Sequence, residues 1–104
     1  MQEQGTKTNV TNMRNLQYLS ESLADECRDP ELKSELEYIA EEIRYSDPVS
    51  CEATAELEIN MQNQLENIRQ VLPTGKKTVI RYFTDQVMKN LKERNRICMS
   101  SKRR

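Results

Sequence analysis

The chain of 104 residues has no histidine and no tryptophan, and it holds only two glycines and three prolines. Histidine is the commonest general base and the commonest metal ligand in proteins. Its absence excludes an ordinary hydrolase triad, a zinc finger and an HExxH metalloprotease. No motif in the sequence points to a bound cofactor or metal, so we expect a protein that is not an enzyme.

Aromatic residues are also scarce, at 5% of the chain, whereas glutamate, lysine, leucine and glutamine are frequent. Strands are enriched in aromatic residues and turns in glycine and proline, while these four residue types favour helices. The composition therefore predicts an all-α protein.

No segment of the sequence has the pattern of a targeting or membrane-spanning element. Residues 1–11 are polar, and no stretch approaches the ~20 apolar residues of a membrane span. The three cysteines, Cys27, Cys51 and Cys98, form no CxxC pair, and their odd number argues against a disulfide framework. We expect a cytoplasmic protein without disulfides.

Apolar residues recur at helical spacing in four segments, which predict helices over residues 10–27, 30–45, 48–72 and 75–97. The third stripe runs Ala53, Leu57, Met61, Leu65, Ile68, Leu72, and the fourth runs Ile80, Phe83, Val87, Leu91. Short joints make successive helices antiparallel neighbours. The expected fold is a small antiparallel four-helix bundle or a pair of helical hairpins, with a flexible arm (1–9), one helical domain (10–97) and a basic tail (98–104).

Two joints carry the same dipeptide, Asp29-Pro30 and Asp47-Pro48. An aspartate accepts hydrogen bonds from the free N–H groups of a helix start, and proline is tolerated at the first helical position. We therefore predict N-caps at Asp29 and at Asp47. Loss of the second cap, by Asp47→Ala, would cost ~0.5–2 kcal/mol.

Charge is divided unevenly along the chain. Residues 1–72 hold 15 Asp/Glu and 6 Lys/Arg, a net charge of −9, whereas residues 73–104 hold 2 and 10, a net charge of +8. Such asymmetry suggests contact with nucleic acid. The alternative is that the two halves attract each other, within one chain or across a homodimer that would enlarge a thin core.

The acidic half supplies a candidate protein-binding face on the second and third predicted helices. Tyrosine is favoured in binding hot spots, and here it lies among carboxylates. A solvated surface is the alternative, and a metal site would normally add a histidine. The residues of this face are Glu35, Tyr38, Glu41, Glu42, Tyr45, Asp47, Glu52 and Glu56.

The basic half supplies a candidate surface for nucleic acid or for a partner. Its lysines and arginines would contact phosphates without reading the base sequence. The alternative is that they pair with the acidic helices. The residues are Lys76, Lys77, Arg81, Lys89, Lys92, Arg96, Lys102, Arg103 and Arg104.

The stretch IRYSDPVS at residues 43–50, followed by Ala53, Ala55 and Leu57, resembles a helix–break–helix segment of small uncharacterised proteins from mobile elements of Gram-positive bacteria. This resemblance implies a plasmid, transposon or prophage setting. Within it we predict a non-enzymatic regulator that binds a protein partner through its acidic helices, with the basic helix near nucleic acid. The alternative is an inhibitor of a nucleic-acid-processing or defence nuclease, whose acidic face imitates nucleic acid.

Overall fold

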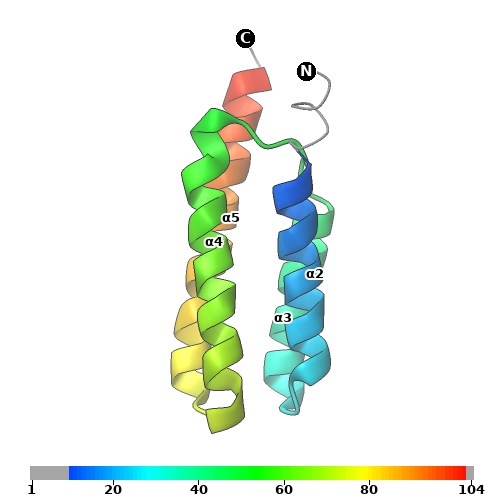
Figure 1. The fold of residues 1–104 in the computed structure, drawn as a ribbon, viewed down its shortest axis with the longest axis vertical. Coiled ribbons are helices and arrows are strands. Elements are labelled where there is room, and N and C mark those ends of the chain that lie inside the picture. Colours follow the sequence, from blue (N-terminus) through cyan, green and yellow to red (C-terminus); the bar gives the residue numbers. More distant parts are fainter. Residues whose placement is uncertain (1–9, 103–104) are drawn as a thin grey trace.

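A computed structural model describes residues 10–102, and these residues form four α-helices with no strand (Figure 1). The helices are α2 (Thr11–Glu26), α3 (Pro30–Arg44), α4 (Glu52–Val71) and α5 (Lys77–Lys102). A 3-10 turn, η1 (Leu72–Thr74), follows α4. The predicted all-α four-helix bundle is confirmed.

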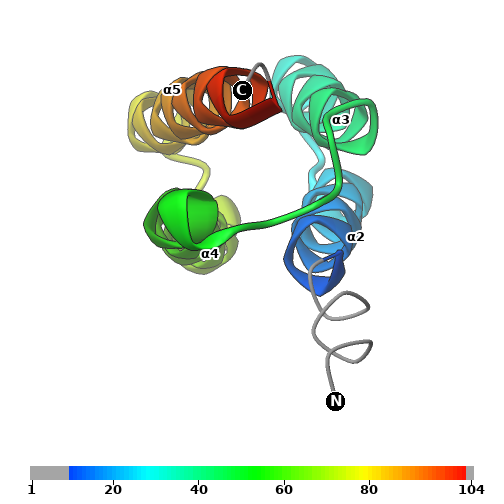
Figure 2. The same ribbon diagram turned by 90° about the horizontal axis from the view of Figure 1, so that it is seen from above.

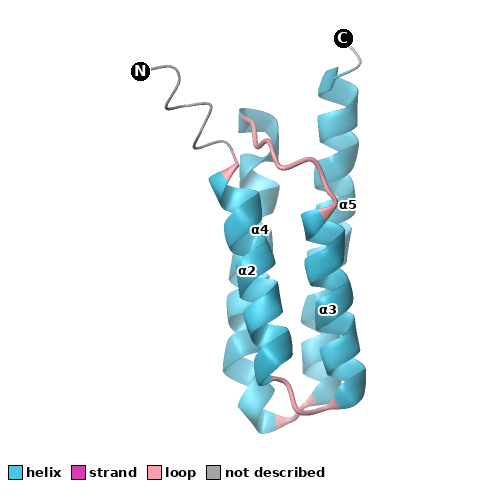
Figure 3. Cartoon of the chain, turned by 90° about the vertical axis from the view of Figure 1, so that its right-hand side faces the viewer, coloured by secondary structure: helices cyan, strands magenta, loops and turns pink. Residues whose placement is uncertain are grey.

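The helices occupy the corners of a square when the bundle is viewed end-on (Figure 2). The hairpins α2–α3 and α4–α5 have the most extensive contacts, and they meet along α2–α4 and α3–α5. The segment between α3 and α4 crosses the end of the bundle diagonally, so these consecutive helices are not neighbours (Figure 2). As a result α3 and α5 run parallel, side by side, and α5 extends beyond the others at the crossover end (Figure 3).

The core follows a heptad pattern in every helix. In α3, which lies within the helix predicted over residues 30–45, the buried apolar residues at spacings of four and three are Leu32, Leu36, Ile39 and Ile43. This spacing presents one apolar stripe to the neighbouring helices. The described part of the chain contains no helix long and apolar enough to cross a membrane.

The predicted stripe of α4 is wrong at its first two positions. Ala53 is exposed and Leu57 only half-buried, while Thr54 and Glu58 take the buried positions one residue further on. In α5 the buried position next to Ile80 belongs to Thr84, and Phe83 is half-buried. Polar residues thus occupy core positions that the sequence pattern assigned to apolar neighbours.

The two Asp-Pro joints behave differently. Asp29 is the predicted N-cap, because its Oδ1 accepts the N–H groups of Glu31 at 2.9 Å and Leu32 at 3.2 Å. The predicted cap at Asp47 is wrong: its Oδ1 accepts the N–H of Val49 at 2.9 Å inside the crossover segment. The helix begins only at Glu52, where Thr54 Oγ1 accepts the N–H of Cys51 at 3.0 Å.

The ends of α5 also differ from the prediction. Gly75 adopts a left-handed conformation with φ of 70°, which closes the preceding turn, and α5 starts at Lys77. The helix continues to Lys102, so the first five residues of the predicted basic tail are helical. The predicted flexible arm, residues 1–9, and residues 103–104 lie outside the described residues.

Candidate protein-interaction site

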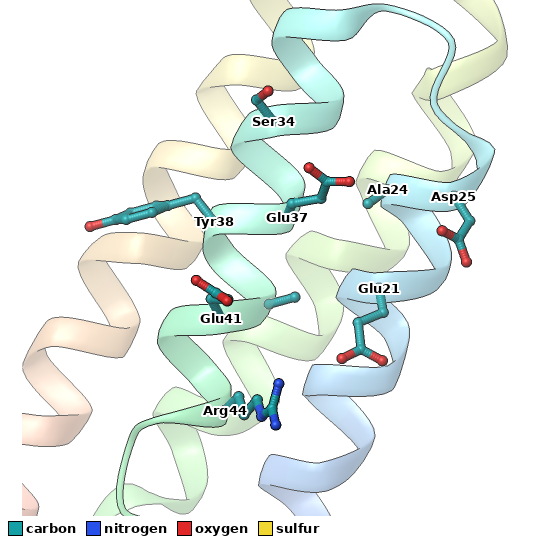
Figure 4. Close-up of a pocket in the computed structure, with 9 residues that line it drawn as sticks. Glu21, Ala24, Asp25, Ser34, Glu37, Tyr38, Glu41 and Arg44 are labelled. Carbon is teal, nitrogen blue, oxygen red and sulfur yellow. The ribbon is translucent and has the colours of Figure 1, made fainter.

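A groove of about 690 Å³ runs between α2 and α3 (Figure 4). Its floor includes the small side chains of Ala24 and Ala40, which are buried. Its walls carry carboxylates from both helices. These are Glu21 and Asp25 from α2, and Glu37 and Glu41 from α3. We refer to this feature as the acidic groove.

Half of these carboxylates have little to neutralise them. Asp25 and Glu41 accept no hydrogen bond and form no ion pair with the described residues. Glu21 accepts the amide of Gln17 at 2.9 Å, and Glu37 lies 4.0 Å from Lys33 in an exposed pair of little strength. The walls of the acidic groove therefore attract cations.

A basic residue, Arg44, also lines the acidic groove. Its guanidinium carbon lies 5.5 Å from the centroid of the Tyr45 ring, a cation–π contact at an exposed site. Figure 4 shows the Arg44 side chain at the end of α3, below the four carboxylates in that view. The acidic groove thus has a cationic end.

The predicted acidic face is not one surface. Tyr38 and Glu41 line the acidic groove, although the Tyr38 ring points away from α2 (Figure 4). Glu35 and Tyr38 line a hollow of about 400 Å³ between α3 and α5. Glu42, Tyr45 and Asp47 line a second hollow of about 330 Å³, between the C-terminal parts of the same two helices.

Glu52 and Glu56 are separate from the other residues of the predicted face. Both belong to α4, which lies diagonally opposite α3 because of the crossover (Figure 2). The expectation of one face across the second and third predicted helices is therefore wrong. The helix that completes the acidic surface of α3 is α2.

The start of α5 is neutralised by α3. Lys77 Nζ lies 3.2 Å from Asp29 Oδ2 and 2.8 Å from Glu31 Oε1. Arg81 donates to Glu31 and to Glu35, each at 3.1 Å. For these two residues, the alternative that the charged halves attract each other within one chain is confirmed.

The charges in this cluster shift one another's pKa values. The N–H of Leu32, and after it the Lys77 ammonium, lower the pKa of Asp29. The hydrogen bond and charge of Lys77 lower the pKa of Glu31, and Glu31 in turn raises the pKa of Lys77. Lys77 and Arg81 therefore pair with carboxylates of the same chain, which would compete with phosphates for these two side chains.

The remaining predicted basic residues do not form a continuous stripe of free cations. Arg96 pairs with Glu93 on the same helix. Lys76, Lys89 and Lys92 form no ion pair with the described residues. The side chain of Lys102, and the residues Arg103 and Arg104, lie outside what the structure describes.

A buried ion pair between α4 and α5 was missed by the sequence reasoning. Arg94 Nε donates to Glu58 Oε2 at 2.9 Å, and the two side chains are 0% and 1% exposed. Arg94 also donates to the backbone carbonyls of Asp47 at 2.6 Å and Val49 at 3.0 Å, and Asn12 donates to Glu58 Oε1 at 3.1 Å. This network holds the crossover segment against the bundle.

The heptad spacing contains the signal that would have revealed this pair. Positions 87, 91, 94 and 98 of α5 are buried at spacings of four, three and four, and Arg94 takes one of them. Glu58 takes a buried position of α4 in the same way, four residues after Thr54 and three residues before Met61. A glutamate and an arginine that both fall on core positions are expected to pair, because an unpaired buried charge is costly.

The cysteines are free thiols: Cys27 and Cys98 are buried and Cys51 is exposed. Burial raises the pKa of the Cys98 thiol. Among residues 10–102, no group of three or more cysteine, aspartate or glutamate side chains is placed to hold a metal ion.

The chain matches no protein-family model, and comparisons with curated proteins and with solved structures returned no significant match.

Proposed function

We propose that the protein is a non-enzymatic binding module that docks a cationic helical segment of a protein partner in the acidic groove. The observation that supports this most directly is the pair Asp25 and Glu41, two carboxylates without partners on the walls of a groove with alanines in its floor. Small floor residues let another helix approach closely, and the carboxylates attract its lysines and arginines. The partner's anionic residues would meet Arg44.

The acidic hairpin also gives the partner a long-range attraction. From Thr11 to Arg44 it holds nine Asp/Glu and four Lys/Arg, a formal net charge of −5. A surface of one sign accelerates association with an oppositely charged partner, and salt weakens the effect. In the mobile-element setting that the resemblance at residues 43–57 implies, we propose a regulatory role, with a nucleic-acid-binding protein as the partner.

The second candidate is an inhibitor of a nucleic-acid-processing enzyme or a defence nuclease. Carboxylates on the two walls of the acidic groove favour it, because they form two rows of negative charge that a phosphate-binding surface would accept. The two candidates use the same groove. They differ in whether the partner loses its nucleic acid when the protein binds.

The test is affinity capture from a Gram-positive bacterial lysate, with and without nuclease treatment. Glu37→Lys/Glu41→Lys should abolish capture of the partner, because it reverses the charge of one wall. The matched control is Glu52→Lys/Glu56→Lys, which makes the same charge change on α4, and it should capture the partner normally. Nuclease should leave capture unchanged.

Equal loss of capture in both double variants would contradict the proposal, because net charge rather than the acidic groove would then control binding. Loss of capture after nuclease treatment would show that nucleic acid bridges the two proteins. If the captured partner is a nuclease or a DNA-binding protein, a gel shift with its own DNA separates the candidates. An inhibitor displaces the DNA, whereas a regulator leaves it bound.

A further inference from the structure

The side of the bundle formed by α3 and α5 exposes large apolar side chains next to two hollows. Tyr38 is 56% exposed, Tyr45 73% and Met99 63%. Tyr38 and the half-buried Met88 line the first hollow, while Tyr45 and Met99 line the second. We call this surface the α3/α5 flank, and define it by Tyr38, Glu42, Tyr45, Met88, Lys92 and Met99.

Among the residues that define the α3/α5 flank, Glu42 on α3 and Lys92 on α5 carry opposite charges without ion-pair partners, whereas the first hollow has a carboxylate, Asp85, on its α5 side. Glu42 lines the second hollow together with Asn95, which follows Lys92 by three residues on α5. Neither the Glu42 carboxylate nor the Lys92 ammonium forms an ion pair with the described residues. The α3 side of the flank is therefore acidic and the α5 side basic at this level.

This division of charge suits a second copy of the same chain. α3 and α5 run parallel (Figure 1), so a two-fold axis along the groove between them places α3 of one copy against α5 of the other. Glu42 of each copy then meets Lys92 of the other, and the apolar side chains face each other. A two-fold axis across the groove would instead place α3 against α3 and bring acids together.

We infer that the protein forms a parallel homodimer through the α3/α5 flank. The bundle measures 44 × 25 × 19 Å, so a face along its length is large enough to contribute the roughly 800 Å² of buried surface that each partner supplies to a standard stable interface. The acidic groove lies on an adjacent side of α3 and shares one residue that defines the flank, Tyr38, so its four carboxylates stay exposed in the dimer. The dimer would present two such grooves facing away from each other. The inference does not depend on the proposed function.

Sedimentation equilibrium over a range of protein concentrations tests the dimer. Glu42→Lys and Lys92→Glu each place like charges opposite each other twice across the axis, so each should weaken dimerisation by about tenfold or more. An equimolar mixture of the two variants should recover the dimer. In the mixed dimer, the Glu42→Lys chain has lysine at positions 42 and 92, and the Lys92→Glu chain has glutamate at both. Each contact between position 42 of one chain and position 92 of the other is then attractive.

The matched controls are Glu52→Lys and Arg69→Glu, the same charge changes on exposed positions of α4. They should dimerise like the unmodified protein, and circular dichroism should show the same helix content in every variant. A chain that stays monomeric at all concentrations overturns the inference. So does a mixture that fails to recover the dimer, or controls that weaken it equally, since either result places the contact elsewhere.

Discussion

Removing the guanidinium of Arg94 should strongly destabilise the protein. Arg94→Ala leaves the Glu58 carboxylate, 1% exposed, without its counter-charge. Breaking a buried pair from one side costs about 3–5 kcal/mol. The carbonyls of Asp47 and Val49 lose donors as well, at about 1–3 kcal/mol for each that stays unsatisfied.

These losses overlap, because water reaches part of the crossover segment once the side chain is gone. We expect a net loss of about 4 kcal/mol, a large share of the roughly 5–15 kcal/mol that stabilises a small domain. At about 4–8 °C per kcal/mol, the melting temperature falls by about 15–30 °C. Urea unfolding monitored by circular dichroism measures the change in the free energy of unfolding.

The matched control is Arg96→Ala, which removes an exposed arginine and its pair with Glu93 on the same helix. It should cost less than about 1 kcal/mol. The double variant Glu58→Met/Arg94→Met should be more stable than Arg94→Ala, because it leaves no unpaired charge in the core. Equal, small costs for Arg94→Ala and Arg96→Ala would refute the buried network.

Three other outcomes are expected. The pKa values of Asp29 and Glu31 are lowered in the folded protein, so their ionised carboxylates stabilise the fold at pH values above the ordinary 3.8 and 4.5. The urea midpoint should therefore fall as the pH drops through these values towards the lowered ones. The fall should be smaller in Asp29→Asn. A thiol reagent should label Cys51 quickly and Cys98 only on unfolding, because Cys98 is buried and its pKa is raised. In low-salt gel shifts, deletion of residues 102–104 should weaken DNA binding more than Lys77→Ala does, since Lys77 pairs with Asp29 and Glu31. A larger loss of binding in Lys77→Ala would instead place the phosphate contacts at the start of α5.

The helices could be predicted because their signals are local. The stripe of Leu32, Leu36, Ile39 and Ile43 defines a buried face by spacing alone, and Asp29 caps the helix that Pro30 begins. These features depend on residues within one or two turns of each other. Contacts with distant parts of the chain did not change these local features.

The diagonal crossover could not be predicted, because it depends on contacts distant in sequence. Asp47-Pro48 carries the same local signal as Asp29-Pro30, yet no helix starts there. The chain must remain extended to cross the end of the bundle, and Arg94 binds the carbonyls of Asp47 and Val49 from α5. A charged residue 47 positions away thus decides the conformation of this segment.

The candidate site could be predicted only in part, because its residues depend on which helices are neighbours in the fold. The sequence identified Tyr38 and Glu41 as surface residues, but grouped them with Glu52 and Glu56 on the assumption that consecutive helices are neighbours. The wall opposite Glu41 comes instead from α2, which the sequence reasoning left out of the acidic face.

The acidic groove is tested most directly by NMR titration of the ¹⁵N-labelled protein with a synthetic alanine-based helix that carries lysines at helical spacing. At low salt, the largest amide shifts should cluster on both walls of the groove, around Asp25 and Glu41, and should disappear in Glu37→Lys/Glu41→Lys. They should persist in Glu52→Lys/Glu56→Lys. Shifts spread evenly over α4 and α5, or equal in both double variants, would contradict a specific cation-binding groove between α2 and α3.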